Sequence, residues 1–251
     1  MNPHHSRRRT LGALLLAAFL AAALAAGAAA FGIAPIRLDF DRDTRTGVIT
    51  LNNDDTIRET FQVRLMRWTQ DATGADHYED SSDLVYFPRL MAVEPKDKRV
   101  IRIGSRGEPA SDEKAYRLYV EEISDGAASA QAGSSIAVRM RFALPIFVAP
   151  AGKAESRAEV VDATLDKGQA HIRVHNAGNR SFKVETITLR DGATEVAEVA
   201  GWYVLAGATR DFAVPIPHDA CTRLKSLEAQ LKNESLDLRR TIAIDPARCG
   251  P

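Results

Sequence analysis

The sequence lacks an excess of charge of either sign and has few cysteines. It contains 33 Lys and Arg residues and 33 Asp and Glu residues, so its formal net charge is zero. This balance provides no basic surface for nucleic acid or for an anionic membrane, and we expect neither as a partner. The only two cysteines, Cys221 and Cys249, lie near the C-terminus. In an oxidising compartment they are a disulfide candidate, and two free thiols are the alternative.

Signatures of catalysis are also missing. The sequence has no glycine-rich phosphate loop, no Cys-x-x-Cys and no Gly-x-Ser-x-Gly. His171 and His175 would share one face of a helix, but the apolar residues that alternate with them indicate a strand, where four residues span about 13 Å. The acidic clusters lie beside turns and strand ends, where Asp is common for backbone reasons alone. These clusters are Asp39, Asp41 and Asp43, and Asp54 with Asp55. We therefore predict no catalytic residue, no metal site, no cofactor and no enzymatic activity.

The first thirty residues have the pattern of an export signal. Three arginines at 7–9 are followed by an apolar run at 11–26 and by a small-residue cleavage site at 28–30. The run is about sixteen residues long, whereas a membrane-spanning helix needs about twenty, and no stop-transfer segment follows. We predict export with cleavage after about Ala30 and no stable membrane insertion. An uncleaved anchor is the alternative, and the arginines leave Sec and twin-arginine export both open.

The remaining chain is rich in short β-type runs separated by turn residues. No helical period is sustained for three turns, and a weak helical stretch at 222–231 stays open. Seven candidate strands precede residue 149, which is the pattern of a β-sandwich. They span 33–40, 48–51, 61–68, 84–87, 99–103, 116–123 and 136–148.

A turn-forming stretch at 149–153 interrupts this pattern and predicts a domain boundary. Six more candidate strands follow it, at 158–165, 169–175, 183–190, 202–205, 210–214 and 236–244. A strand ending in Asn, a polar turn and a strand beginning Phe-x-Val occur in both parts, at Asn53 and Phe61 and at Asn176 and Phe182. We therefore predict an all-β fold of two immunoglobulin-like sandwich domains with a cleft between them. The predicted division is a signal at 1–30, an N-terminal domain at 31–150 and a C-terminal domain at 151–251.

Several short stretches of the first part carry a resemblance through their order. They are Ile-Ala-Pro-Ile-Arg at 33–37, Leu-Asn-Asn at 51–53, Trp68, Leu-Val-Tyr-Phe-Pro-Arg at 84–89, Val-Glu-Pro at 93–95, Val-Ile-Arg-Ile at 100–103, Tyr-Arg-Leu-Tyr-Val-Glu-Glu-Ile at 116–123 and the run at 136–148. This ordered set resembles the PapD-like periplasmic chaperones of the chaperone–usher pathway. The resemblance implies a periplasmic protein whose partners are pilin subunits and an outer-membrane usher.

The run at 136–148 presents large apolar residues at every second position. These residues are Ile136, Val138, Met140 and Phe142. In an ordinary sandwich such a row points into the strand's own core. In the PapD-like family the same strand is donated to a pilin that lacks its final strand, so the resemblance implies that these side chains fill the groove of the subunit.

The resemblance also implies an anchor for the C-terminal carboxylate of the subunit, made by two basic residues in the cleft. Arg37 matches the first of these, and its planar fork suits a carboxylate. A surface ion pair is the alternative role for Arg37. The sequence departs from the family at the second position, where Ala143 replaces a lysine, a pattern more like the archaic branch of these chaperones. Arg139 and Arg141 are the candidates for the missing partner.

The sequence thus favours a non-enzymatic periplasmic chaperone that binds pilin subunits by donor-strand complementation. The alternative is a secreted immunoglobulin-like structural or adhesive module without chaperone activity.

Overall fold

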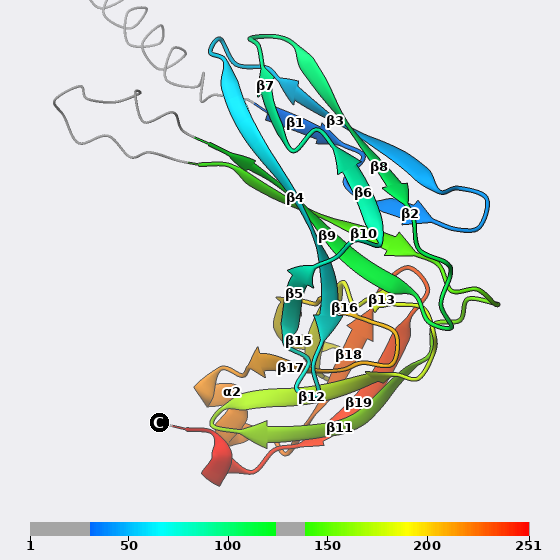
Figure 1. The fold of residues 1–251 in the computed structure, drawn as a ribbon. Coiled ribbons are helices and arrows are strands. Elements are labelled where there is room, and N and C mark those ends of the chain that lie inside the picture. Colours follow the sequence, from blue (N-terminus) through cyan, green and yellow to red (C-terminus); the bar gives the residue numbers. More distant parts are fainter. Residues whose placement is uncertain (1–30, 124–138, 251) are drawn as a thin grey trace, which may run out of the picture.

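The computed structural model describes residues 31–123 and 139–250, and these form two β-rich halves that meet at an angle (Figure 1). The first half contains β1 (Phe31–Ala34), β2 (Leu38–Phe40), β3 (Thr46–Asn53), β4 (Glu59–Gln70), β5 (Asp76–Asp80), β6 (Leu84–Phe87), β7 (Leu90–Val93), β8 (Lys98–Ser105), β9 (Lys114–Glu122) and β10 (Arg141–Val148).

The second half contains most of the remaining strands and two short helical segments. The strands are β11 (Ala158–Asp166), β12 (Gln169–Asn176), β13 (Phe182–Lys183), β14 (Thr186–Asp191), β15 (Thr194–Ala200), β16 (Tyr203–Val204), β17 (Thr209–Pro215), β18 (Ser226–Lys232) and β19 (Asp237–Ala243). The helical segments are α2 (His218–Arg223) and the 3-10 turn η1 (Pro246–Arg248).

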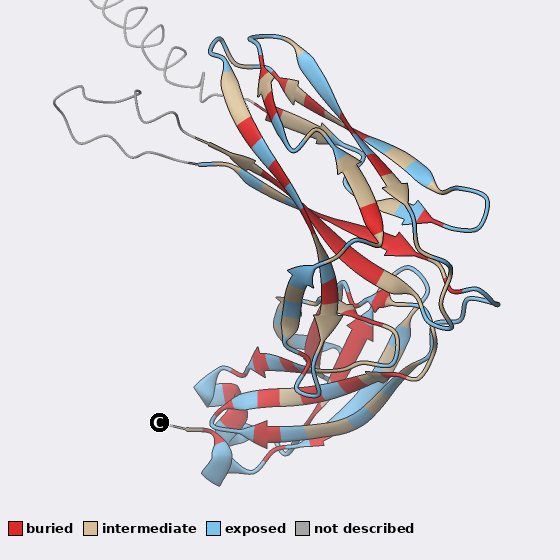
Figure 2. Cartoon of the chain, viewed as in Figure 1, coloured by how far each residue is buried: buried red, intermediate tan, exposed pale blue. Residues whose placement is uncertain are grey.

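The first half is a sandwich of two sheets. One sheet has the strand order β1-β3-β8-β6, and the other has the order β2-β10-β9-β4-β5, with β7 also pairing with β4. Alternation along β4 shows how the sequence builds the core, because Phe61, Val63 and Leu65 point inward and are buried while Gln62 and Arg64 between them are exposed. In Figure 2 the buried residues run along the centres of β4, β9 and β10.

The second half has a core of its own. Its strand orders are β11-β12-β17 and β15-β14-β18-β19, and β13 pairs with β16. The buried cluster between them runs from Leu165 to Cys249 and shares no residue with the cluster of the first half. The all-β architecture of two sandwiches predicted from the sequence is confirmed.

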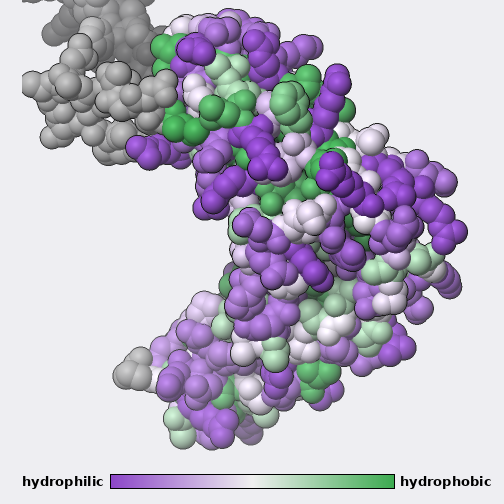
Figure 3. All heavy atoms as spheres, viewed as in Figure 1, coloured by the Kyte–Doolittle hydropathy of each residue, from purple (hydrophilic) through white to green (hydrophobic). Residues whose placement is uncertain are grey.

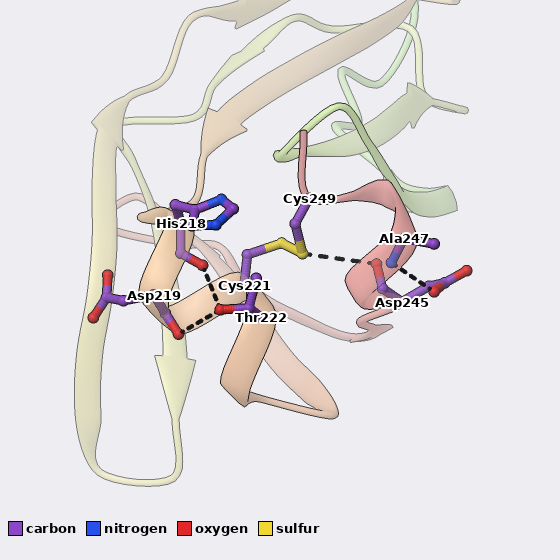
Figure 4. Close-up of a disulfide and its surroundings, with 7 residues drawn as sticks. All are labelled: His218, Asp219, Cys221, Thr222, Asp245, Ala247 and Cys249. Carbon is purple, nitrogen blue, oxygen red and sulfur yellow. Dashed lines mark hydrogen bonds between the residues drawn. A yellow bond between two sulfur atoms is a disulfide. The ribbon is translucent and has the colours of Figure 1, made fainter. Parts of the chain in front are cut away.

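A disulfide joins Cys221 of α2 to Cys249, which follows η1 (Figure 4). Both cysteines are buried in the core of the second half. The bond attaches the C-terminal end of the described chain to the rest of that sandwich. It closes a loop with a sequence separation of 28 residues.

Several predicted strands differ from the observed ones. The single strand expected at 33–40 is interrupted between β1 and β2, because the chain changes sheets there. The run expected at 136–148 is a strand from Arg141, and 136–138 lie outside the described residues. The stretch left open at 222–231 is mostly strand β18, with α2 before it. Strands β5, β7, β15 and β18 are not predicted from the sequence.

Two buried asparagines, Asn53 and Asn176, have the same structural role in the two halves. The side-chain amide of Asn53 donates to the carbonyl of Ile57 (2.8 Å), and its oxygen accepts from the N–H of Asp55 (2.9 Å). Asn176 donates to the carbonyl of Arg180 (2.9 Å), and its oxygen accepts from Gly178 (3.0 Å). The shared geometry explains the repeated Asn in the sequence, since each side chain satisfies the backbone of the turn that follows it.

We predict that Asn53→Ala lowers the free energy of unfolding by about 2–3 kcal/mol, because it leaves buried backbone groups without partners. Asn53 also donates to the carbonyl of Val93 and is 1% exposed. The neighbouring Asn52→Ala is the matched control, because Asn52 is only partly buried, and it should change the value by less than ~0.5 kcal/mol. Urea unfolding measures both variants, and equal effects would contradict this role of Asn53.

Candidate functional site

The edge of β10 that faces away from β9 is open over part of its length. β1 pairs with β3 in one sheet, and after residues 35–37 the chain enters the other sheet as β2. β2 runs parallel to β10 and pairs only with residues Ile146–Val148. Among the described residues, therefore, no strand covers this edge of β10 from Arg141 to Pro145. An unpaired strand edge is a template for another chain.

The apolar row of β10 continues from this open edge into the core. Leu144, Ile146 and Val148 are at most 8% exposed. Phe142 and Met140 occupy the same side of the chain by alternation, are half-buried and pack against the same core. Ile136 and Val138, the other predicted members of the row, lie outside the described residues. The apolar row is therefore buried in the core of the sandwich at Val148 and becomes more exposed toward Met140.

Exposed apolar surface also lies near the end of the open edge at Pro145, where the chain crosses from β1 to β2. Only three residues separate β1 from β2, so the free edges of the two sheets lie on the same side of the sandwich. Ile33 of β1 is half-buried against the core, and Ile36 in the crossing segment is 71% exposed.

Arg37 lies where the open edge ends, directly before β2. Its Nε and Nη2 atoms donate to the two carboxylate oxygens of Asp39 at 2.7 and 2.6 Å, and its guanidinium lies 4.5 Å from the centre of the Phe147 ring. The hydrogen bond to Asp39 raises the pKa of Arg37. Asp39 occupies one edge of the guanidinium fork, so the end formed by Nη1 and Nη2 retains donors for a second acceptor.

The structure does not bring Arg139 and Arg141 to Arg37. Arg141 points to the opposite face of β10 from Phe142, where its Nε lies 2.7 Å from Glu121 and its guanidinium lies 4.2 Å from the centre of the Tyr119 ring. Arg139 is exposed just before β10. Arg37 lines a cavity between the two halves, and neither Arg139 nor Arg141 lines it.

Arg117, on β9 opposite Pro145, is a buried cation that the sequence analysis missed. It is 4% exposed, and its guanidinium lies 4.0 Å from the ring centre of Trp68 and 5.2 Å from that of Trp202. Trp68 belongs to the first half and Trp202 to the second, so this stacking holds the halves together. Its Nη2 is the one buried side-chain polar atom of the described residues that lacks a hydrogen-bond partner.

Asp76 of β5 forms a second connection between the halves. Its carboxylate accepts from the indole nitrogens of Trp68 (2.9 Å) and Trp202 (2.8 Å) and pairs with Arg210 (3.2 Å). The side chain of Gln70 bonds to backbone groups of Tyr203 and Leu205 in the second half. These contacts fix the orientation of the two sandwiches.

Glu113, before β9, forms the third connection. Its carboxylate is 3% exposed and accepts from the backbone N–H (3.0 Å) and the hydroxyl of Ser181 in the second half. Burial raises the pKa of Glu113 above its ordinary value, although the Ser181 bonds act in the opposite direction. The side chain of Asn179 adds bonds to the carbonyls of Ser111 and Lys153.

Metal-binding clusters and membrane spans do not occur in the described residues. No group of three or more His, Cys, Asp or Glu residues there could hold a metal ion. His171 and His175 both lie on β12 with separate partners, Asp211 and Thr209. None of the described helices is long and apolar enough to cross a membrane.

Known proteins share this architecture. The profile of a family described as pili and flagellar-assembly chaperone, PapD N-terminal domain, matches residues 30–154. No curated protein sequence matches the chain. The solved structures described next are at most 19% identical to this chain, so their similarity shows that they share its fold.

Three solved structures illustrate this similarity. The CsuC–CsuE chaperone–tip adhesin complex of archaic Csu pili from Acinetobacter baumannii shares 19% identity over 85% of this chain and 98% of that chain, with a TM-score of 0.62. The Salmonella enterica SafA pilin–SafB chaperone complex shares 13% identity over 86% and 98%, with a TM-score of 0.55. The Pseudomonas aeruginosa CupB2 chaperone shares 14% identity over 85% and 100%, with a TM-score of 0.54.

We predict that the contribution of Glu113 to stability falls as the pH rises. Its pKa is raised in the folded protein, so between its ordinary value of 4.5 and the folded value the folded state binds more protons than the unfolded state. Wild-type protein should therefore gain stability relative to Glu113→Gln as the pH falls from about 7 to 4.5.

Denaturant unfolding at several pH values measures this difference. The exposed Glu159, which pairs with Arg157, provides the control Glu159→Gln. A difference between wild type and Glu113→Gln that does not change with pH would show that burial does not control the ionisation of Glu113.

Proposed function

We propose that this chain binds pilin subunits by adding β10 to their incomplete fold. The match over its first half makes it a member of the PapD-like family of pilus-assembly chaperones. The observation that carries this proposal is the open edge of β10 together with its apolar row. Main-chain hydrogen bonds along the edge would provide affinity, and the apolar side chains would fill the groove of the subunit. Each buried side chain would contribute up to about 2 kcal/mol.

The direction of the added strand follows from β2. β2 runs parallel to β10, and a strand that continues its line along Arg141–Pro145 in the same direction would end at Arg37. A parallel strand therefore brings its C-terminal carboxylate to the guanidinium, whereas an antiparallel strand would bring its positively charged N-terminal end. Arg37 favours the parallel arrangement.

The remaining assignments form part of the same proposal. The family is non-enzymatic, and we assign this chain no turnover. We further propose that residues 1–30 direct it to the periplasm and are removed, that the domain boundary lies at residue 150, and that an outer-membrane usher receives the subunit from it. Similar proteins support a pilin subunit as the partner, because they include chaperones in complex with a pilin and with a tip adhesin.

We predict that Met140→Asp abolishes capture of a pilin subunit, lowering affinity by more than ~100-fold. The substitution would place an unpaired carboxylate in the groove, which costs several kcal/mol. Ala143→Asp is the matched control, because Ala143 lies on the opposite face of the same strand and is exposed. Co-purification with subunits encoded beside this gene, together with titration of the purified proteins, measures both variants.

The melting temperature of each free variant separates binding from folding. Met140 is only half-buried, so Met140→Asp should lower the melting temperature by a few degrees at most. A large loss of stability, with capture lost only in proportion to unfolding, would show that β10 completes its own core and is not donated.

We predict that Arg37→Gln weakens subunit binding by at least ~10-fold, because a charge-assisted bond to the terminal carboxylate is lost. Arg99→Gln is the matched control: Arg99 pairs with Asp97 at 2.8 Å and is 47% exposed, much like Arg37 with Asp39, but it lies on the other sheet. Isothermal titration with a purified subunit compares the two. If the two substitutions changed the subunit affinity equally, Arg37 would have no role beyond its surface ion pair with Asp39.

A further inference from the structure

A cavity of about 600 Å³ lies between the two halves beside Arg37. Arg37 is the one residue of the first half that lines it, and the second half provides the remainder. Two further cations line the cavity, Arg180 and Lys183, and the acids in its lining are Glu185 and Glu234. A carboxylate bound at the end of the Arg37 fork would therefore face the second half of the molecule.

The turn that carries Arg180 is held rigidly. The buried Asn176 side chain bonds to the carbonyl of Arg180, and Gly178 packs so closely that a Cβ atom would lie 2.2 Å from the carbonyl oxygen of Glu155. Ser181, the next residue, donates twice to the buried carboxylate of Glu113. Since Glu113 belongs to the first half, the position of Arg180 is fixed relative to Arg37. A cation held in this way needs little ordering when it binds an anion.

The acidic partners of Arg37 and Arg180 leave the guanidinium of Arg180 available to bind an anion. Asp39 offsets the charge of Arg37 through two short hydrogen bonds. Arg180 is 49% exposed, and its nearest acidic partner, Glu113, lies 3.8 Å from its Nε while already accepting two bonds from Ser181. The guanidinium of Arg180 therefore retains donors that can bind a carboxylate.

We propose that Arg180 is the second cation of the carboxylate site, so that this site is built from both halves of the chain. The ligand is the terminal carboxylate of a peptide strand that lies along β10. This inference rests on the proposed function, because it assumes that a strand ends at Arg37. It replaces Arg139 and Arg141, which lie away from the cavity, as the partner of Arg37.

A peptide pair tests the inference without a known subunit. The probe is an acetylated hexapeptide of alternating Thr and Val that ends in Phe, prepared once with a free carboxylate and once with a terminal amide. Each is titrated into the isotope-labelled full chain, and the dissociation constant is taken from the chemical shifts of the β10 amides. The variants are Arg37→Gln, Arg180→Gln and the control Arg157→Gln, which changes an exposed arginine outside the cavity.

We expect wild-type protein to bind the free acid about 10-fold more tightly than the amide. Arg37→Gln and Arg180→Gln should each remove most of this preference and leave binding of the amide unchanged, and Arg157→Gln should leave the preference intact. A preference lost in Arg37→Gln but kept in Arg180→Gln would overturn the role of Arg180 and leave the proposed function standing.

Two other outcomes count against the proposed function as well. One is equal binding of acid and amide by wild-type protein, since no terminal carboxylate then contributes. The other is the absence of chemical-shift changes on β10 with either peptide, since no strand is then added there. Melting temperatures of all variants, expected within about 2 °C of wild type because the changed residues lie at the surface, verify that each one is folded.

Discussion

The structure depends on one topological constraint, the crossing of the chain from one sheet to the other at residues 35–37. β1 completes the edge of one sheet, and β2 reaches the other sheet only at Ile146. Among the described residues no strand pairs with the edge of β10 from Arg141 to Pro145, although its apolar row is continuous with the core. A protein normally protects such an edge from association, so its retention beside an apolar row indicates a binding function.

The junction between the halves gives this edge a defined end. Three groups connect one sandwich to the other: Arg117, which packs against Trp68 and Trp202, the carboxylate of Asp76, and the buried carboxylate of Glu113. These contacts fix the second half beside Arg37 and so define the cavity between them. In Figure 3 the molecule is hollowed between the halves, and this side is mostly hydrophilic, with apolar groups more frequent in the first half. Under the proposed function, the apolar row and the polar cavity would contact different parts of one ligand.

The sequence predicted the features that depend on the alternation of apolar residues and on the order of short motifs along the chain. Alternation identified β4 and β12, and the turn-forming stretch at 149–153 separates the two cores. The repeated Asn before a turn correctly indicated two similar sandwiches, since Asn53 and Asn176 satisfy equivalent turns. The resemblance identified the family because the ordered stretches lie in the half that its profile matches.

Other features could not be predicted, because they depend on contacts between distant residues. Nothing near Arg117 or Glu113 in the sequence shows that each meets the second half. Arg180 lies about 140 residues from Arg37, and only the closing of the junction places both at one cavity. Strand β5 is rich in charged residues, so it shows no apolar alternation that could have revealed it. The crossing at 35–37 was hidden because the apolar pattern continues through it.

Hydrogen exchange of the β10 backbone amides tests the central claim most directly. In the free chain the amides between Arg141 and Leu144 that point away from β9 should exchange rapidly, because no strand in the described part of the chain covers them. In a complex with a pilin subunit the same amides should exchange at least ~100-fold more slowly, while those bonded to β9 should change little. A stable complex in which exchange along β10 is unchanged would contradict the donation of this strand.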